Sequence, residues 1–144
     1  MSANPDAEIA AALGRVCDPC SIASQAPLSI LDMGLVQSWS IDDKGNLVVR
    51  MCVTSAGCTM VAHMVRAAEA ELVTIRGLSS ARVEVDAGVL WTPAAMTERG
   101  RAILEARRET SMRVAEAVPQ QWRKSAQAGW LLLPQTSSRL AGDR

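Results

Sequence analysis

The sequence predicts an α+β fold, in which a small mixed three-stranded sheet is covered by helices on one face. Periodicity indicates elements in the order helix, strand, strand, helix, strand, helix. The predicted helices carry apolar stripes, and such stripes need a sheet or another helix to cover them. With 144 residues, of which 49% are hydrophobic, the chain is long enough to bury a core without disulfides. The order of the strands in the sheet stays open.

A first helix is predicted over residues 7–16, where apolar residues recur at helical spacing. These residues are Ile9, Ala12, Leu13 and Val16. Asp18-Pro19 is expected to end this helix, because proline disfavours helical dihedral angles in the residue before it. Residues 21–29 have the composition of a loop, so no helix is expected there.

Two strands are predicted over residues 37–41 and 47–54, because the loop between them has the Asp, Gly and Asn content of a hairpin. Alternation in the second strand separates two faces. The inward face is expected to carry Leu47, Val49, Met51 and Val53, and the other face Arg50, Cys52 and Thr54.

A second long helix is predicted over residues 59–75, with Gly77 as its C-terminal stop. A third strand follows over residues 81–86, with Val83 and Val85 inward.

Thr97 is expected to cap a last helix that runs to about residue 117. The core stripes end before it, so residues 1–110 are predicted to form one domain. Residues 111–144 are then a C-terminal extension with scattered apolar residues, among them Trp122 and Trp130. We expect this extension to bind a partner or a second copy, or else to cover the open face of the sheet.

The composition argues against several classes of function. The net charge is zero and the chain has no Tyr or Phe, so neither electrostatics nor stacking favours nucleic-acid binding. No apolar run reaches the length of a membrane span, and residues 1–12 lack the pattern of a signal peptide. We therefore expect a cytoplasmic protein that binds neither membrane nor nucleic acid. In that compartment its four cysteines are expected to be free, metal-bound or reactive.

Cys58 is the strongest candidate for chemistry, because it lies where the second predicted strand meets the following helix. The free N–H groups and positive dipole of a helix start lower the pKa of a thiol, which makes the thiolate available as a nucleophile or ligand. Gly57 is expected to allow a close backbone approach and unusual dihedral angles at the bend. The alternative is a small buried residue that fills space at the start of the helix.

Cys17 and Cys20 have the two-residue gap of a metal knuckle or a redox pair. A structural zinc site needs four ligands, so Cys58 is the expected third and Cys52 a fourth candidate. Cys52 alone is better explained as a small residue that fills the strand. His63 lies five residues after Cys58, outside the spacing of helical ligand pairs, and is expected on a solvated helix face.

Five pieces of the sequence, in order, resemble the SufT/PaaD-type family of iron–sulfur cluster assembly factors, also called the MIP-eighteen family. They are Asp18-Pro19, Ile30-Leu31-Asp32-Met33-Gly34-Leu35-Val36, Val53-Thr54 with Gly57-Cys58, Val83-Glu84-Val85 and Trp91-Thr92-Pro93. The resemblance covers about residues 7–105 and implies the fold of the NifU C-terminal scaffold domain. It also implies a non-catalytic accessory role in delivering clusters or metal to client enzymes, with Cys58 as the key cysteine.

The resemblance further implies roles for Thr54, whose hydroxyl would lie beside the thiolate, and for Asp18 and Asp32, which would orient or ligate. The alternative for Thr54 is a cap at the strand end, and for the two aspartates simple turn chemistry. Trp91 is expected to be a packing anchor. The chain departs from the family at Cys20, which replaces the usual acidic residue. It departs again at Thr59, where proline is common, and in a longer loop before Asp32.

We thus expect an accessory protein for iron–sulfur cluster or metalloenzyme maturation that binds a cluster or zinc transiently through Cys58, Cys20 and Cys17. Its expected partners are client metalloenzymes or iron–sulfur assembly proteins, and a homodimer is a further expectation. Two alternatives stay open: a thiol redox protein that uses Cys17 and Cys20, and a structural interaction module with inert cysteines.

Overall fold

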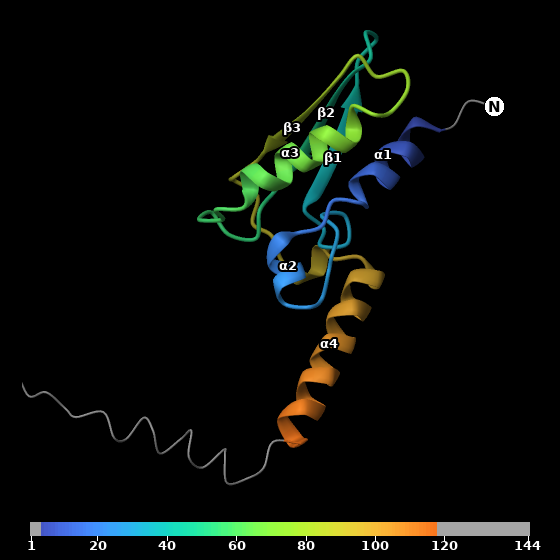
Figure 1. Ribbon diagram of the computed structural model, residues 1–144. Helices are drawn as coiled ribbons and strands as arrows, with labels where there is room; N and C mark the ends of the chain where they lie inside the picture. The colour runs from blue at the N-terminus through green and yellow to red at the C-terminus, as the bar shows by residue number, and fades with distance from the viewer. Residues whose placement is uncertain (1–3, 118–144) are drawn as a thin grey trace, which may run out of the picture. The chain divides into compact units, whose positions relative to one another are not determined.

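The computed structural model describes residues 4–117. The chain divides into two units, residues 1–107 and 108–144, and all packing described below belongs to the first. The elements in order are α1 (Pro5–Leu13), α2 (Pro19–Ala23), β1 (Val36–Ile41), β2 (Asn46–Met51), α3 (Val61–Leu72), β3 (Ser80–Val85), the 3₁₀ helix η1 (Pro93–Ala95) and α4 (Glu98–Ala117) (Figure 1).

The strands form one mixed sheet in the order β1-β2-β3. β1 pairs with β2 antiparallel, as a hairpin requires, and β3 pairs with β2 in parallel after the crossover through α3. Figure 1 shows α3 lying across the sheet with α1 close to it. The predicted fold class, a mixed three-stranded sheet with helices on one face, is confirmed.

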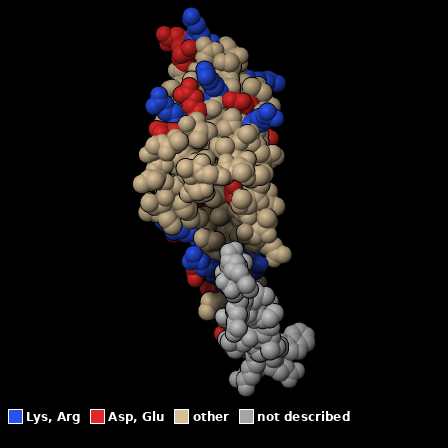
Figure 2. Space-filling model, turned by 90° about the vertical axis from the view of Figure 1, so that its left-hand side faces the viewer, with Lys and Arg blue, Asp and Glu red and all other residues tan. Residues whose placement is uncertain are grey.

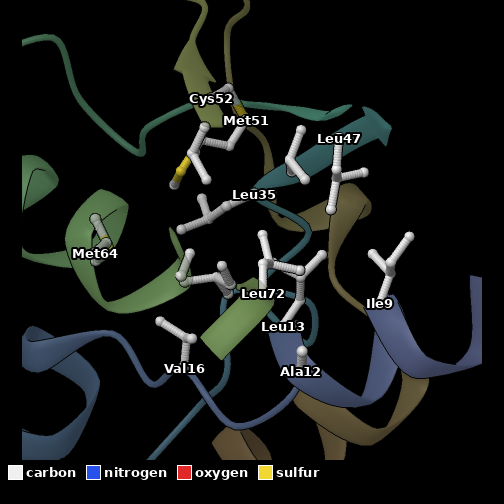
Figure 3. Close-up of a cluster of buried hydrophobic side chains, with 14 residues drawn as sticks. Ile9, Ala12, Leu13, Val16, Leu35, Leu47, Met51, Cys52, Met64 and Leu72 are labelled. Carbon is white, nitrogen blue, oxygen red and sulfur yellow. The ribbon is translucent and has the colours of Figure 1, made fainter. Parts of the chain in front are cut away.

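The core lies between the central strand and the two covering helices (Figure 3). All four residues of the first predicted helical stripe are buried, and α3 buries Met64, Ala68 and Leu72. On β2 the alternation holds as far as the strand extends, because Leu47, Val49 and Met51 are fully buried while Arg50 is exposed. Periodicity thus located the core correctly.

Val85 is an exception, because it is 39% exposed whereas Val83 is buried. By strand alternation Val85 shares the face of Val83, as predicted, but it is the last residue of an edge strand and is left partly uncovered.

The boundary between the first two helices also differs from expectation. α1 ends at Leu13, and the N–H of its C-cap Gly14 donates to the Ala10 carbonyl. Asp18-Pro19 does not end α1 but begins α2, a short helix where the sequence predicted a loop. The physical reason is that aspartate is a good N-cap and proline suits the first helical position, whose N–H has no partner in any case.

β2 is shorter than predicted and ends at Met51. One further hydrogen bond, from the Cys52 N–H to the Leu35 carbonyl at 2.8 Å, continues the register of the Val36–Met51 pair. The expected alternation does not extend to Cys52, which is fully buried, or to Thr54, which is exposed in the loop that follows.

The start of α4 is as predicted. The Thr97 hydroxyl oxygen accepts a hydrogen bond from the Gly100 N–H at 3.0 Å, which is the geometry of an N-cap. Among the described residues no helix is long and apolar enough to cross a membrane.

A truncated chain that ends at Thr110 is expected to unfold cooperatively, because within residues 4–117 the whole hydrophobic core precedes it. Differential scanning calorimetry is the measurement, and the calorimetric and van't Hoff enthalpies should agree. An insoluble product, or one without a cooperative transition, would place part of the core beyond this boundary. The expected partner-binding extension lies mostly outside the described residues.

Candidate functional site

Cys58 lies in loop 52–60, which joins β2 to α3. Its side chain is half-buried and packs against the edge of the core, and its N–H donates to the Ser55 carbonyl at 3.1 Å. α3 begins at Val61 with Met60 as its N-cap, so Cys58 precedes the cap by two residues. The helix was expected to begin directly after Cys58 and begins two residues later. Because the effect of the helix dipole falls off within the first helical turn, the loop and not the helix presents the thiol.

Gly57 does not have the role that the sequence suggested. It is not among the residues with positive φ, and a Cβ added there would have no atom within 4 Å. Thr54 is exposed in the same loop, four residues before Cys58. Loop 52–60 thus contains both family-matched residues, Thr54 exposed and Cys58 half-buried.

The other cysteines differ sharply in accessibility, and all four are free. Cys17 is half-buried and its backbone forms an antiparallel bridge with Ser29. Cys20, the second residue of α2, is exposed. Since α1 ends at Leu13, Cys17 lies outside the helix, as its expected role requires.

Cys52 is a core residue, as expected of a small strand-filling side chain. It is fully buried, and its Sγ accepts a hydrogen bond from Gln37 Nε2 at 3.3 Å. Burial raises the pKa of the Cys52 thiol, which keeps it protonated and unsuited to bind metal.

The structure does not assemble the thiols into a preformed metal centre. Within residues 4–117 no three His, Cys, Asp or Glu side chains lie together in a group that could hold a metal ion. Cys17, Cys20 and Cys58 therefore do not form a three-thiolate set. A resident structural zinc, which needs four ligands, does not fit this arrangement. His63 lies on the exposed side of α3, as expected.

Asp18 is buried and caps α2. Its Oδ2 accepts from the Ser21 N–H at 2.8 Å, and the Ser21 hydroxyl in turn donates to the Asp18 carbonyl at 2.7 Å. Ser21 also accepts from the Leu28 N–H, so this network closes the loop that follows α2. Asp18 thus positions the helix that carries Cys20, which agrees with the turn-chemistry alternative.

Asp32 connects its loop to the start of α4. Its Oδ1 accepts from the Thr97 hydroxyl at 2.8 Å, and its Oδ2 lies 3.8 Å from Arg99 Nε. The Asp32 carbonyl also accepts from the Thr97 N–H. Gly100 packs so closely on this carbonyl that an added Cβ would lie 2.4 Å from it. This carboxylate therefore has structural partners on both oxygens.

An apolar pocket of about 230 Å³ lies next to α2. Its lining residues are Asp18, Cys20, Ser21, Ser24, Ala26, Leu28, Met33, Trp91, Met96 and Leu104. Trp91 is fixed in the wall, because its Nε1 donates to the Met33 carbonyl at 2.6 Å. This agrees with its expected role as a packing anchor.

Sequence reasoning missed this pocket, because its residues come from four separate segments. A signal was present, since residues 19–31 and 87–97 contain no charged side chain.

The comparisons with known proteins agree with this fold. The sequence profile of the family described as "Iron-sulfur cluster assembly protein" matches residues 6–85, more than half of the chain. An uncharacterised protein of Methanocaldococcus jannaschii is 30% identical over 79 residues, which are 55% of this chain and 78% of that protein.

Two solved structures are similar. The crystal structure of a domain of unknown function from Bacillus anthracis is 24% identical with a TM-score of 0.62, and the match covers 70% of this chain and 92% of that one. A conserved hypothetical protein from Thermotoga maritima is 28% identical with a TM-score of 0.56, and the match covers 67% of this chain and 89% of that one. The profile match runs from α1 to the end of β3 and includes Cys17, Cys20 and Cys58. The chain therefore belongs to the iron–sulfur cluster assembly protein family.

Proposed function

We propose that the protein is a cytoplasmic, non-catalytic accessory factor that helps to deliver iron–sulfur clusters to client metalloenzymes through the thiolate of Cys58. The observation that supports this proposal is the position of Cys58, a free and accessible thiol on loop 52–60 within the part of the chain that matches the family. Thiolate is the soft ligand that iron–sulfur clusters and zinc prefer.

The arrangement of the thiols favours transient over permanent binding. Cys58 offers one ligand to the cluster, which is the cargo, and the described part of the chain contains no group of three ligands. The remaining ligands of the cluster must then come from a client, an assembly protein or a second copy of the chain. A cargo held by so few ligands is easily released, as delivery requires. In this proposal Cys20, exposed on α2, is the second contributing thiol, whereas Cys17 does not join Cys20 and Cys58 in one three-thiolate set among the described residues.

Anaerobic reconstitution tests the proposal. The full chain, incubated with ferrous iron and sulfide and then desalted without oxygen, is expected to retain iron and acid-labile sulfide in equal amounts. The cluster should pass from the loaded chain to an apo-ferredoxin. It should pass less readily to a control protein whose metal has been removed with a chelator. Iron, sulfide and zinc contents are measured together with the visible absorption spectrum. Retention of zinc alone, or of no metal by the parent chain under these conditions, would contradict the proposed cargo.

A further inference from the structure

The pocket beside α2 is part of a face with few charges. Four stretches of the sequence lack Lys, Arg, Asp and Glu, namely residues 19–31, 33–41, 51–65 and 87–97. The side of the molecule in Figure 2 shows a wide uncharged zone, with most charged side chains gathered above and below it. Loop 52–60 lies on this side of the domain in Figure 1. Residues of three of these stretches, 19–31, 33–41 and 87–97, line the pocket together.

The pocket itself is apolar, and its one charged residue is already engaged. Leu28, Met33, Trp91 and Leu104 are among its apolar lining residues. Asp18 is only 6% exposed, and its Oδ2 is used as the cap of α2. An occupant with a charge would lose its hydration without gaining a countercharge, which is costly. Charge complementarity thus calls for a neutral, apolar occupant.

Size points to a single side chain rather than a cofactor. The volume of about 230 Å³ is below the range of about 300–1,000 Å³ that is usual for small-molecule sites. One large aliphatic or aromatic side chain fits this space. Interfaces commonly bury such anchors in a pocket surrounded by weaker contacts.

Exposed apolar side chains flank the lining residues in the sequence. Ile22 follows the lining residue Ser21 and is 55% exposed, and Leu90 precedes Trp91 and is 90% exposed. Neither side chain lines the pocket, so they serve below as exposed positions next to lining residues in the chain.

We propose that this pocket is the docking site for an uncharged peptide segment of the client protein, which inserts one large apolar side chain beside Trp91. This inference rests on the proposed function, because the exposed Cys20 lines the same pocket and a docked client would lie next to that thiol. It adds the chemistry of the partner: the segment is neutral and carries an aliphatic or aromatic anchor.

The test uses two blocked peptides that differ only at their centre, one with Leu-Trp and the other with Lys-Lys between Gly and Ser residues. Each is titrated into the ¹⁵N-labelled full chain, and amide chemical shifts are recorded. The Leu-Trp peptide is expected to shift the amides of Ser21, Leu28 and Leu104, and the Lys-Lys peptide to shift none of them. Equal binding of both peptides, or shifts confined to other regions, would overturn the proposal.

Variants then tie binding to the pocket. The exposed pair Ile22→Lys with Leu90→Lys, and separately Leu104→Glu, should each weaken the Leu-Trp peptide by about tenfold or more. Val73→Lys is the matched control, because Val73 is an exposed apolar residue (58%) that does not line the pocket. The affinity of this variant for the Leu-Trp peptide should stay within about twofold of that of the parent chain. Circular dichroism shows whether each variant folds. If Leu104→Glu does not fold, the test rests on the variant with the two exposed substitutions. Unchanged affinity in that pair and in a folded Leu104→Glu variant would refute the docking site.

Two further measurements separate this inference from its alternatives. Cys58→Ser is expected to bind the peptide like the parent chain. A parent chain that bound the peptide but no cluster would therefore contradict the proposed cargo and leave the docking site intact. A chain that ends at Ala117 is expected to bind the peptide with unchanged affinity. If removal of residues 118–144 instead raised the affinity strongly, the occupant would be the chain's own C-terminal segment and the proposed partner would be wrong.

Discussion

Cys58→Ser is expected to abolish the retention of iron and sulfide after anaerobic reconstitution, because it removes the proposed primary ligand of the cluster. A serine hydroxyl is a hard and weakly acidic donor that does not replace a thiolate. The measurement is iron and acid-labile sulfide per chain after desalting. Circular dichroism should be unchanged, since Cys58 is only half-buried at the edge of the core.

The other cysteines provide graded controls for this prediction. Cys20→Ser should reduce retention without abolishing it, because Cys20 is the proposed second thiol. Cys52→Ser should leave retention intact and lower thermal stability, because Cys52 is fully buried and its Sγ is bonded to Gln37. Equal and mild effects of all three substitutions on retention would favour inert thiols. A crystal structure with the Cys20 and Cys58 sulfurs more than roughly 8 Å apart, too far to share one ion, would leave Cys58 acting alone.

Gly34→Ala is expected to destabilise the fold by about 2–5 kcal/mol, as the sum of left-handed strain and a steric clash. Gly34 has a φ of +70°, and an added Cβ would lie 2.0 Å from the Ala95 carbonyl oxygen. The backbone of Pro93–Ala95 would have to move, and with it Trp91 and Met96 in the pocket wall. Chemical denaturation measures the loss of stability, and the Leu-Trp peptide should bind this variant more weakly.

Two other glycines separate the two causes. Gly77 has a φ of +91° but no neighbour within 4 Å of an added Cβ, so Gly77→Ala should cost only the strain, about 1–2 kcal/mol. Gly57 has neither a positive φ nor a neighbour, so Gly57→Ala should be neutral or stabilising by up to about 1 kcal/mol. Similar losses in all three variants would mean that the close approach of Gly34 to Ala95 does not contribute.

Much of the fold could be predicted from local patterns. The helical stripe around Ile9 and Leu13, the alternation of Leu47 and Val49, and the Thr97 cap each depend on residues close in sequence, and the structure confirms them. Hydrophobic spacing and capping chemistry act over a few residues, so one sequence suffices to recognise them.

The ends of the elements were harder to predict, because contacts from distant residues decide them. β2 ends at Met51, and the true start of α3 at Val61 leaves Cys58 in a loop. Asp18 was noted as a candidate ligand, but its bond to Ser21 makes it a helix cap. For Asp18 the sequence allowed two uses of one residue, and a hydrogen bond selected one of them.

The fold class, the core stripes and the family can all be read from the amino-acid sequence, because each is encoded in short-range spacing and in motifs that follow one another along the chain. The accessibility of Cys17, Cys20 and Cys58 emerged only from the fold, which exposes Cys20 and half-buries Cys17 and Cys58. The apolar pocket also exists only in three dimensions, because segments as distant as Leu28 and Leu104 form its wall. The physical reason is that burial depends on which segments pack together, and that packing is a property of the whole chain.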